Sequence, residues 1–208
     1  MAPINTESNA GELVPRPALK TGFSEMGWGS TPLLSTNNMN EDYFIPVNTD
    51  INFLPKVKEF IPNAIWKWVP SMFIATNLSS THIGDDQLLS KIHKEFLGEL
   101  NLYKIPCKSV YGWHQDKNSI GCSLNMALDR YHCHTLFSVG NHGTPFLQKV
   151  IELEYDPNTW YAFNSKQVHT VINLDEKDRY LLSYVLPGIF SYTDLKSWLV
   201  QHTYTSLM

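Results

Sequence analysis

Two stretches decide the fold of this 208-residue chain: SVYGWHQDKNSIGCSLNMALDRYHCHTLFSV at residues 109–139 and VHTVINLDEKDRYLLSYVL at residues 168–186. Within and between them, short runs rich in β-branched and aromatic residues follow one another with turn residues in between. Six or more closely spaced strands predict an antiparallel β-sandwich or barrel. The runs are SIGCSLNMAL, CHTLFSV, FLQKVIELEY, TWYAF, VHTVINL and RYLLSYVL.

Helical segments flank this β-rich region. At residues 85–100 apolar residues recur at three- and four-residue steps, and Asp85 and Asp86 suit a helix start. Residues 192–202 form an amphipathic segment that should pack back on the sheet. Between residues 53 and 68 we expect a short helix broken at prolines, with Trp66 and Trp68 in the core. The fold class is therefore α+β, mainly β.

Composition excludes several classes of protein. Hydrophobic residues make up 43% of the chain and charged residues 17%, which is typical of a compact globular protein. A net charge of -4 and a pI near 6.0 disfavour nucleic acid as a partner. No apolar run approaches the roughly 20 residues that cross a bilayer, and the N-terminus lacks the pattern of an export signal. We expect a cytoplasmic protein without membrane contacts.

The chain divides into two parts of unequal character. Residues 1–40 are rich in Pro, Gly, Ser, Thr and Asn, which predicts an irregular N-terminal segment. The length of the remainder favours one domain at residues 41–208. Its three cysteines form no C-x-x-C pair, so neither a disulfide framework nor a thiolate zinc site is indicated.

A candidate metal site lies in the first stretch. Residues i and i+2 of an extended segment point the same way, so His114 and Asp116 of the HQD motif can reach one ion. His169 lies in the later run VHTVINL, far enough along the chain to return beside them. Two imidazoles and one carboxylate on one face of a metal form the ligand set of oxygen-activating iron(II).

Arg179 stands ten residues after His169 at the start of an apolar strand. A guanidinium there would be partly buried and would need an anionic partner. A dicarboxylate co-substrate would supply one through a bidentate contact.

An H-x-D motif, a distal His and an Arg about ten positions beyond resemble the signature of the iron(II)/2-oxoglutarate-dependent oxygenase superfamily, with a likeness to the prolyl and aspartyl hydroxylases. The resemblance implies a double-stranded β-helix (jelly-roll) core at about residues 101–190, with N-terminal helices packed on the sheet. It implies iron ligation by His114, Asp116 and His169, which are also the catalytic residues, and 2-oxoglutarate binding by Arg179. The cofactors would be Fe(II), 2-oxoglutarate and O2.

Three further residues enter as candidates for binding 2-oxoglutarate. Asn101 and Tyr103 resemble the N-x-Y pair of several subfamilies, although they lie two residues further from the histidine than expected. Ser183 stands four residues after Arg179; the Arg-x-Ser pairing of plant-type members is absent because Leu181 occupies that place.

The resemblance implies hydroxylation of an amino-acid, peptide or related small-molecule C–H bond, with release of succinate and CO2. Related halogenases lack the carboxylate that Asp116 supplies. Oxidative demethylation of nucleobases is an alternative, but those enzymes carry a second Arg where this chain has Val185. A third possibility is a non-catalytic, cupin-like metal-binding barrel, which has no need of Arg179.

Other roles for neighbouring residues stay open. Arg179 could instead pair with the acidic turn before it. His132 and His134 could form a second ligand pair, although we expect one to line the pocket and the other to be solvated. The aromatic residues before the motif, Tyr111 and Trp113, both suit the core, and Trp113 is also a candidate for the pocket.

Overall fold

The computed structural model describes residues 40–47, 54–76, 78, 83, 86–117, 120–130, 132–139 and 149–203. The predicted irregular segment therefore lies outside the described residues, apart from Asn40. The described chain is mainly β, as predicted. Its strands are β1 (Phe44–Val47), β2 (Trp66–Val69), β3 (Met72–Ala75), β4 (Glu99–Ile105), β5 (Ser109–His114), β6 (Ile120–Ala127), β7 (Cys133–Val139), β8 (Lys149–Leu153), β9 (Trp160–Phe163), β10 (His169–Asn173) and β11 (Arg179–Pro187).

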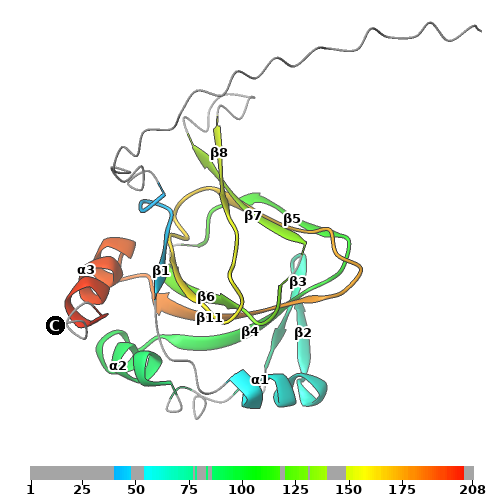
Figure 1. The fold of residues 1–208 in the computed structure, drawn as a ribbon, viewed down its shortest axis with the longest axis horizontal. Coiled ribbons are helices and arrows are strands. Elements are labelled where there is room, and N and C mark those ends of the chain that lie inside the picture. Colours follow the sequence, from blue (N-terminus) through cyan, green and yellow to red (C-terminus); the bar gives the residue numbers. More distant parts are fainter. Residues whose placement is uncertain are drawn as a thin grey trace, which may run out of the picture. The chain divides into compact units, whose positions relative to one another are not determined.

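These strands form two antiparallel sheets that face each other (Figure 1). The larger sheet has seven strands in the order β1-β9-β6-β11-β4-β3-β2, and the smaller has four in the order β5-β10-β7-β8. From β4 onward, consecutive strands alternate between the sheets in most steps, so residues distant in sequence lie side by side. Each of the six sequence runs predicted as strands contains a strand in the structure.

The helices lie on the outer side of the larger sheet (Figure 1). They are α1 (Leu54–Phe60), followed by the 3-10 turn η2 (Ile61–Asn63), then α2 (Gln87–Phe96) and α3 (Tyr192–Thr203). The Asp86 carboxylate caps α2 by accepting from the Leu89 N–H at 2.8 Å. The helix is shorter than the predicted 85–100, because Leu97 adopts a left-handed φ of 51° and Glu99 already begins β4.

Alternation along β11 divides the interior into two regions. Leu182, Tyr184 and Leu186 point toward the helices and are fully buried in the main core. Arg179 and Ser183 occupy alternate positions and point between the two sheets. The first face stabilises the fold, and the second is free to carry a site.

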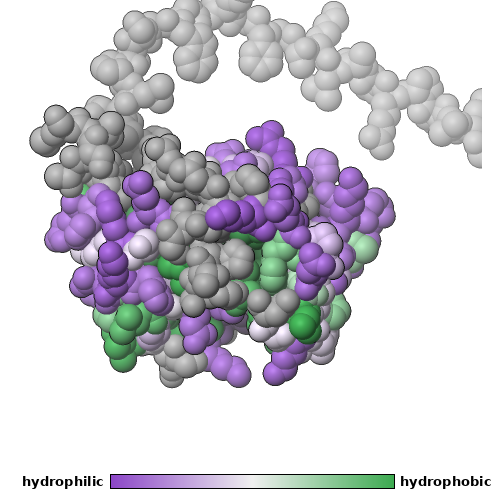
Figure 2. Space-filling view, turned by 90° about the horizontal axis from the view of Figure 1, so that it is seen from below, coloured by the Kyte–Doolittle hydropathy of each residue, from purple (hydrophilic) through white to green (hydrophobic). Residues whose placement is uncertain are grey.

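The prediction that both Trp66 and Trp68 belong to the core is wrong for Trp68. Trp66 is partly buried against the core, but Trp68 is 58% exposed on the edge strand β2. The two side chains point to the same side of the strand, and Trp68 lies past the end of the core. The face of the molecule that is seen from below shows hydrophobic side chains among hydrophilic ones (Figure 2). All three cysteines are free thiols. No helix in the described ranges has both the length and the apolar character needed to cross a membrane.

Candidate metal centre and its cavity

The structure brings His114, Asp116 and His169 together. His114 ends β5 and is the register partner of His169 at the start of β10, and Asp116 follows two residues later. One potential ligand atom from each residue lies within 4.8 Å of the other two, and His114 Nε2 is 3.7 Å from Asp116 Oδ1. We call these three residues the metal trio, because this spacing suits a single ion.

Both imidazoles of the metal trio are oriented by backbone carbonyl groups. His114 Nδ1 donates to the Gly112 carbonyl at 2.7 Å, and His169 Nδ1 donates to the Gln167 carbonyl at 2.9 Å. In this tautomer each Nε2 keeps its lone pair for a metal ion. The donor set therefore fits a divalent transition metal.

The turn between β9 and β10 braces the H-x-D segment. The Asp116 N–H donates to the Ser165 carbonyl at 3.0 Å, and Gln115 Nε2 donates to the Lys166 carbonyl at 2.8 Å. Lys166 Nζ reaches back to the Lys117 carbonyl at 2.8 Å and to the Asp116 carbonyl at 3.5 Å. These cross-connections position a ligand that lies beyond the end of its strand.

Burial shifts the pKa values of Asp116 and His169 in the directions that favour their neutral forms. Burial raises the pKa of Asp116, and the charges of His114 and Lys166 offset part of that rise. Burial lowers the pKa of His169 to about 4. His169 is therefore a neutral imidazole at physiological pH, the form that binds metal ions.

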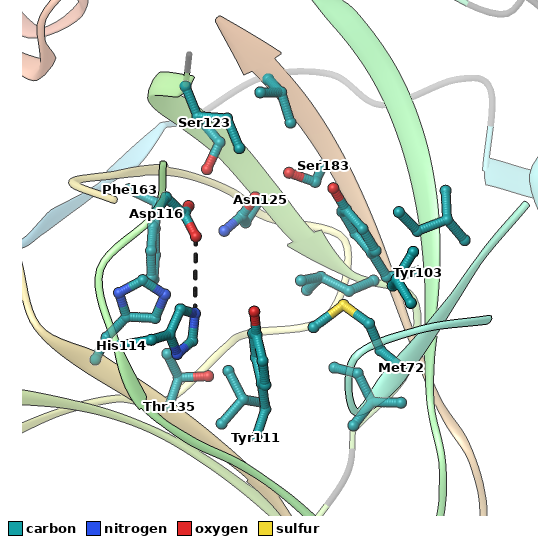
Figure 3. Close-up of a pocket in the computed structure, with 18 of the residues that line it drawn as sticks. Met72, Tyr103, Tyr111, His114, Asp116, Ser123, Asn125, Thr135, Phe163 and Ser183 are labelled. Atoms are coloured by element: carbon teal, nitrogen blue, oxygen red, sulfur yellow. Dashed lines mark ion pairs between the residues drawn. The ribbon is translucent and has the colours of Figure 1, made fainter. Parts of the chain in front are cut away.

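The metal trio lies in a cavity of about 210 Å³ between the two sheets (Figure 3). In the close-up, the hydroxyl groups of Tyr103 and Tyr111 point into the same space as the His114 and Asp116 side chains. The cavity is lined by Val69, Met72, Ile74, Tyr103, Ile105, Tyr111, His114, Asp116, Ile120, Ser123, Asn125, Thr135, Tyr155, Phe163, His169, Val171, Leu181, Ser183 and Val185.

Arg179 is a buried cation next to this cavity. Its side chain is 2% exposed, and its Nη1 donates to the hydroxyl of Thr135, a lining residue, at 3.4 Å. Its Nε has no hydrogen-bond partner, and among the described residues no carboxylate forms an ion pair with the guanidinium. The acidic turn before it is used elsewhere: Asp178 accepts from the Cys107 N–H, and Glu176 pairs with Lys108.

Sequence reasoning missed Tyr155, which lies at this end of the cavity, and Asn125, which also lines the cavity. The Tyr155 ring stacks under the Arg179 guanidinium, with 4.9 Å from Cζ to the ring centroid. Burial raises the pKa of Tyr155 to about 12, while Arg179 and a hydrogen bond with Asn125 act in the opposite direction. Both residues lie in apolar runs without a recognisable motif, so only their spatial neighbours reveal them.

The other residues predicted to bind 2-oxoglutarate lie in two different places. Tyr103 and Ser183 line the cavity, and burial raises the pKa of Tyr103 to about 12. Asn101 is not brought to the cavity; its side chain lines a separate surface hollow with His93 and Gly98. The reason is its place near the start of β4, two residues before Tyr103 and close to the end of α2.

A β-bulge reverses the expectations for Tyr111 and Trp113. The pairing of β5 with β10 shifts register between His169 and Val171, so that Tyr111 and His114 both point inward despite their odd spacing. Their ring centroids are 3.9 Å apart. Trp113 turns outward and is 41% exposed, so the expectation that it belongs to the core is wrong, and it does not line the pocket either.

The other histidine pair does not reach the cavity. His134 bonds to Glu152 on the outer face of the smaller sheet, and exposed His132 lies next to the turn that contains Asp175. The expectation that one of them lines the pocket is wrong, because the strand alternation that turns Thr135 inward turns His134 outward.

Neither a family model nor a curated protein matches the sequence. Solved structures do match. An oxidoreductase of the 2OG-Fe(II) oxygenase family from Burkholderia pseudomallei is 12% identical, with 72% of this chain and 86% of that chain covered and a TM-score of 0.52. HygX from Streptomyces hygroscopicus, with nickel, 2-oxoglutarate and hygromycin B bound, is 11% identical, with coverage of 72% and 84% and a TM-score of 0.50.

A prolyl hydroxylase from Trichoplax adhaerens, in complex with a peptide of the oxygen degradation domain of hypoxia inducible factor, is 14% identical. The match covers 74% of this chain and 87% of that chain, with a TM-score of 0.53. The fold of this chain is thus that of 2-oxoglutarate oxygenases. The predicted resemblance to this superfamily is confirmed at the level of the fold.

Proposed function

We propose that this protein is an iron(II)- and 2-oxoglutarate-dependent oxygenase. The observation that carries the proposal is Arg179, a buried guanidinium without a carboxylate partner among the described residues, placed beside the cavity that contains the metal trio. A buried cation is costly unless an anion neutralises it. The distal carboxylate of 2-oxoglutarate would do so, with Thr135 and Tyr155 as its neighbours.

The strand order supports a double-stranded β-helix core at about residues 101–190. Four strands of the larger sheet run β4-β11-β6-β9, and the smaller sheet runs β5-β10-β7-β8. In this arrangement the first and last strands of the core, β4 and β11, are neighbours, which is how a jelly roll closes a two-sheet barrel. The Arg179 position follows from it, because β11 crosses the floor of the cavity.

Each residue of the site has a role in the proposed reaction. His114, Asp116 and His169 would hold Fe(II) on one face. Bound iron supplies the oxidation chemistry, in which a substrate C–H, 2-oxoglutarate and O2 become C–OH, succinate and CO2. Tyr103 and Ser183 would contact the co-substrate, and the surrounding apolar side chains exclude water from the reacting groups.

Hydroxylation of an amino-acid, peptide or related small-molecule C–H bond is our preferred reaction. The retained Asp116 carboxylate argues for hydroxylation over halogenation, as the resemblance implied. Two structural neighbours were solved with a peptide and with hygromycin B, respectively. Val185 lines the cavity where a nucleobase demethylase would carry its second arginine, so that alternative is disfavoured.

Anaerobic titration with iron(II) and 2-oxoglutarate tests the proposal. The wild-type protein should develop the weak visible absorption band of an iron–2-oxoglutarate chelate and should release succinate in air. Arg179→Met should weaken co-substrate binding by at least tenfold, about 1.4 kcal/mol, with iron affinity nearly unchanged. Arg130→Met is the matched control, because Arg130 is exposed and its ion pair with exposed Asp156 is long, at 3.9 Å.

The outcomes separate the candidate functions. Iron binding without a chelate band in the wild-type protein would favour the cupin-like metal-binding alternative. Equal 2-oxoglutarate affinity in wild type and Arg179→Met would remove the co-substrate role of Arg179. Absence of iron binding would contradict the whole assignment.

A further inference from the structure

One wall of the cavity comes from a hairpin outside the eight strands of the proposed core. Val69 of β2 pairs with Met72 of β3, and Ile74 of β3 pairs with Tyr103 of β4. All four side chains line the cavity and are only partly buried. In the close-up, Met72 lies beside Tyr103, with Tyr111 between it and His114 (Figure 3). We call Val69, Met72 and Ile74 the hairpin wall.

Charge is scarce around this cavity. Among the described residues that line it, none is Lys, Arg or Glu, and the only carboxylate and imidazoles are those of the metal trio. A metal ion would engage these three groups, and Arg179 is assigned to the co-substrate. A charged substrate group placed against the hairpin wall would therefore find no counter-ion among the described lining residues, which is costly.

Neutral polar groups face the same space from β6 and β11. They are Ser123, Asn125 and Ser183. Asn125 is 7% exposed, and its Oδ1 is buried without a hydrogen-bond partner among the residues that the structure describes. An orphaned acceptor needs an N–H or O–H donor. Ionised carboxylates only accept hydrogen bonds, so 2-oxoglutarate cannot supply one.

We infer that the primary substrate presents an uncharged, apolar group to the hairpin wall and donates a neutral N–H or O–H to Asn125 Oδ1. A capped apolar amino-acid residue within a peptide has both features. This inference rests on the proposed function, because it names the substrate of that reaction. Binding of the substrate can nevertheless be measured without turnover. The hairpin wall is then a determinant of substrate specificity.

Methyl NMR on the zinc-loaded, 2-oxoglutarate-bound protein tests binding without turnover. Methionine methyl groups are labelled with ¹³C, and the Met72 signal is assigned from Met72→Leu. N-acetyl-leucinamide and N-acetyl-prolinamide are the neutral probes; N-acetyl-lysinamide and N-acetyl-aspartamide are the charged ones. The neutral probes should shift the Met72 signal in the millimolar range, and the charged probes should leave it unchanged. Shifts with the charged probes alone, or with no probe, would overturn the inference.

Substitutions locate the effect on one face of the hairpin. Met72→Glu and the milder Met72→Gln should weaken binding of the neutral probes at least tenfold and reduce probe-stimulated succinate release, while the iron–2-oxoglutarate band stays at wild-type strength. Trp68→Glu is the control, because Trp68 is exposed on the other face of the hairpin. Equal effects of Met72→Gln and Trp68→Glu would contradict the inference. If the wild-type protein shows no iron–2-oxoglutarate band but the neutral probes still shift the Met72 signal, only the proposed function is contradicted.

Discussion

His169 meets two requirements, burial and metal binding, that both fail when its ring is protonated at low pH. It is 4% exposed, which holds its ring in place, and burial lowers its pKa from 6.5 to about 4. Both the buried position and a metal ion require the neutral ring. The histidine that suits a metal ion in the folded protein is therefore also a source of acid sensitivity in the metal-free protein.

The first prediction concerns the stability of the metal-free protein between pH 6.5 and 4. The unfolded chain protonates His169 near pH 6.5, whereas the folded chain resists protonation until about pH 4. Stability is therefore present above pH 6.5 and is lost as the pH falls through this window, by on the order of 3 kcal/mol. In His169→Gln, urea unfolding should show a flatter pH dependence. His134→Gln, a control on the outer face, should keep the wild-type slope; equal slopes in both variants would refute the prediction.

Lys166 is a positioning residue in the same neighbourhood. Its Nζ bonds to the carbonyl groups of Lys117 and Asp116, and its own carbonyl accepts from Gln115. Lys166→Met should lower metal affinity by about 10-fold or more, because such supporting contacts orient the ligands. Competition with a chelator measures this affinity. Lys91→Met, on the exposed side of α2, should not change it; an unchanged affinity in Lys166→Met would show that the brace is dispensable.

At the scale of elements, the close contact between β6 and the chain after β11 is sensitive to a single methyl group. A Cβ on Gly121 would lie 1.8 Å from the Phe190 carbonyl oxygen and 2.7 Å from that of Pro187. Because both obstacles are backbone atoms, the strand itself would have to move.

We predict that Gly121→Ala lowers the free energy of unfolding by about 1–3 kcal/mol. Gly112→Ala is the matched control, since a Cβ there meets nothing within 4 Å. It should change stability by no more than about 0.5 kcal/mol. Chemical denaturation of both variants provides the measurement, and similar losses in the two would argue against a steric cause.

At the scale of the whole molecule, buried Arg179 lowers the stability of the ligand-free protein and provides a binding site for an anion. The fold buries in β11, between the two sheets, a guanidinium that has no carboxylate partner among the described residues. Arg179→Met should therefore raise the stability of the ligand-free protein by about 1–3 kcal/mol. The same variant should lose the increase in melting temperature that 2-oxoglutarate gives the zinc-loaded wild type. Differential scanning calorimetry with and without ligand distinguishes the two effects, and a less stable ligand-free variant would contradict the first.

Several features of the fold and the site could be predicted from the sequence because they depend on local patterns. Apolar runs with turns between them predict strands, and three- and four-residue spacing predicts α2 and α3. The H-x-D spacing, the later histidine and the arginine ten residues on predict four side chains that the structure places around one cavity. Trp68 and Trp113 could not be placed in this way, because exposure depends on what lies opposite an element.

What the sequence by itself determined is the set of strands, the flanking helices and the residues that carry the proposed chemistry. The tertiary structure alone decided that Tyr111 joins His114 through a bulge, that Tyr155 stacks on Arg179, and that the β2–β3 hairpin closes the cavity. Strand pairing joins segments that are distant along the chain, and its register is set by side-chain packing across both sheets. No local pattern contains that information.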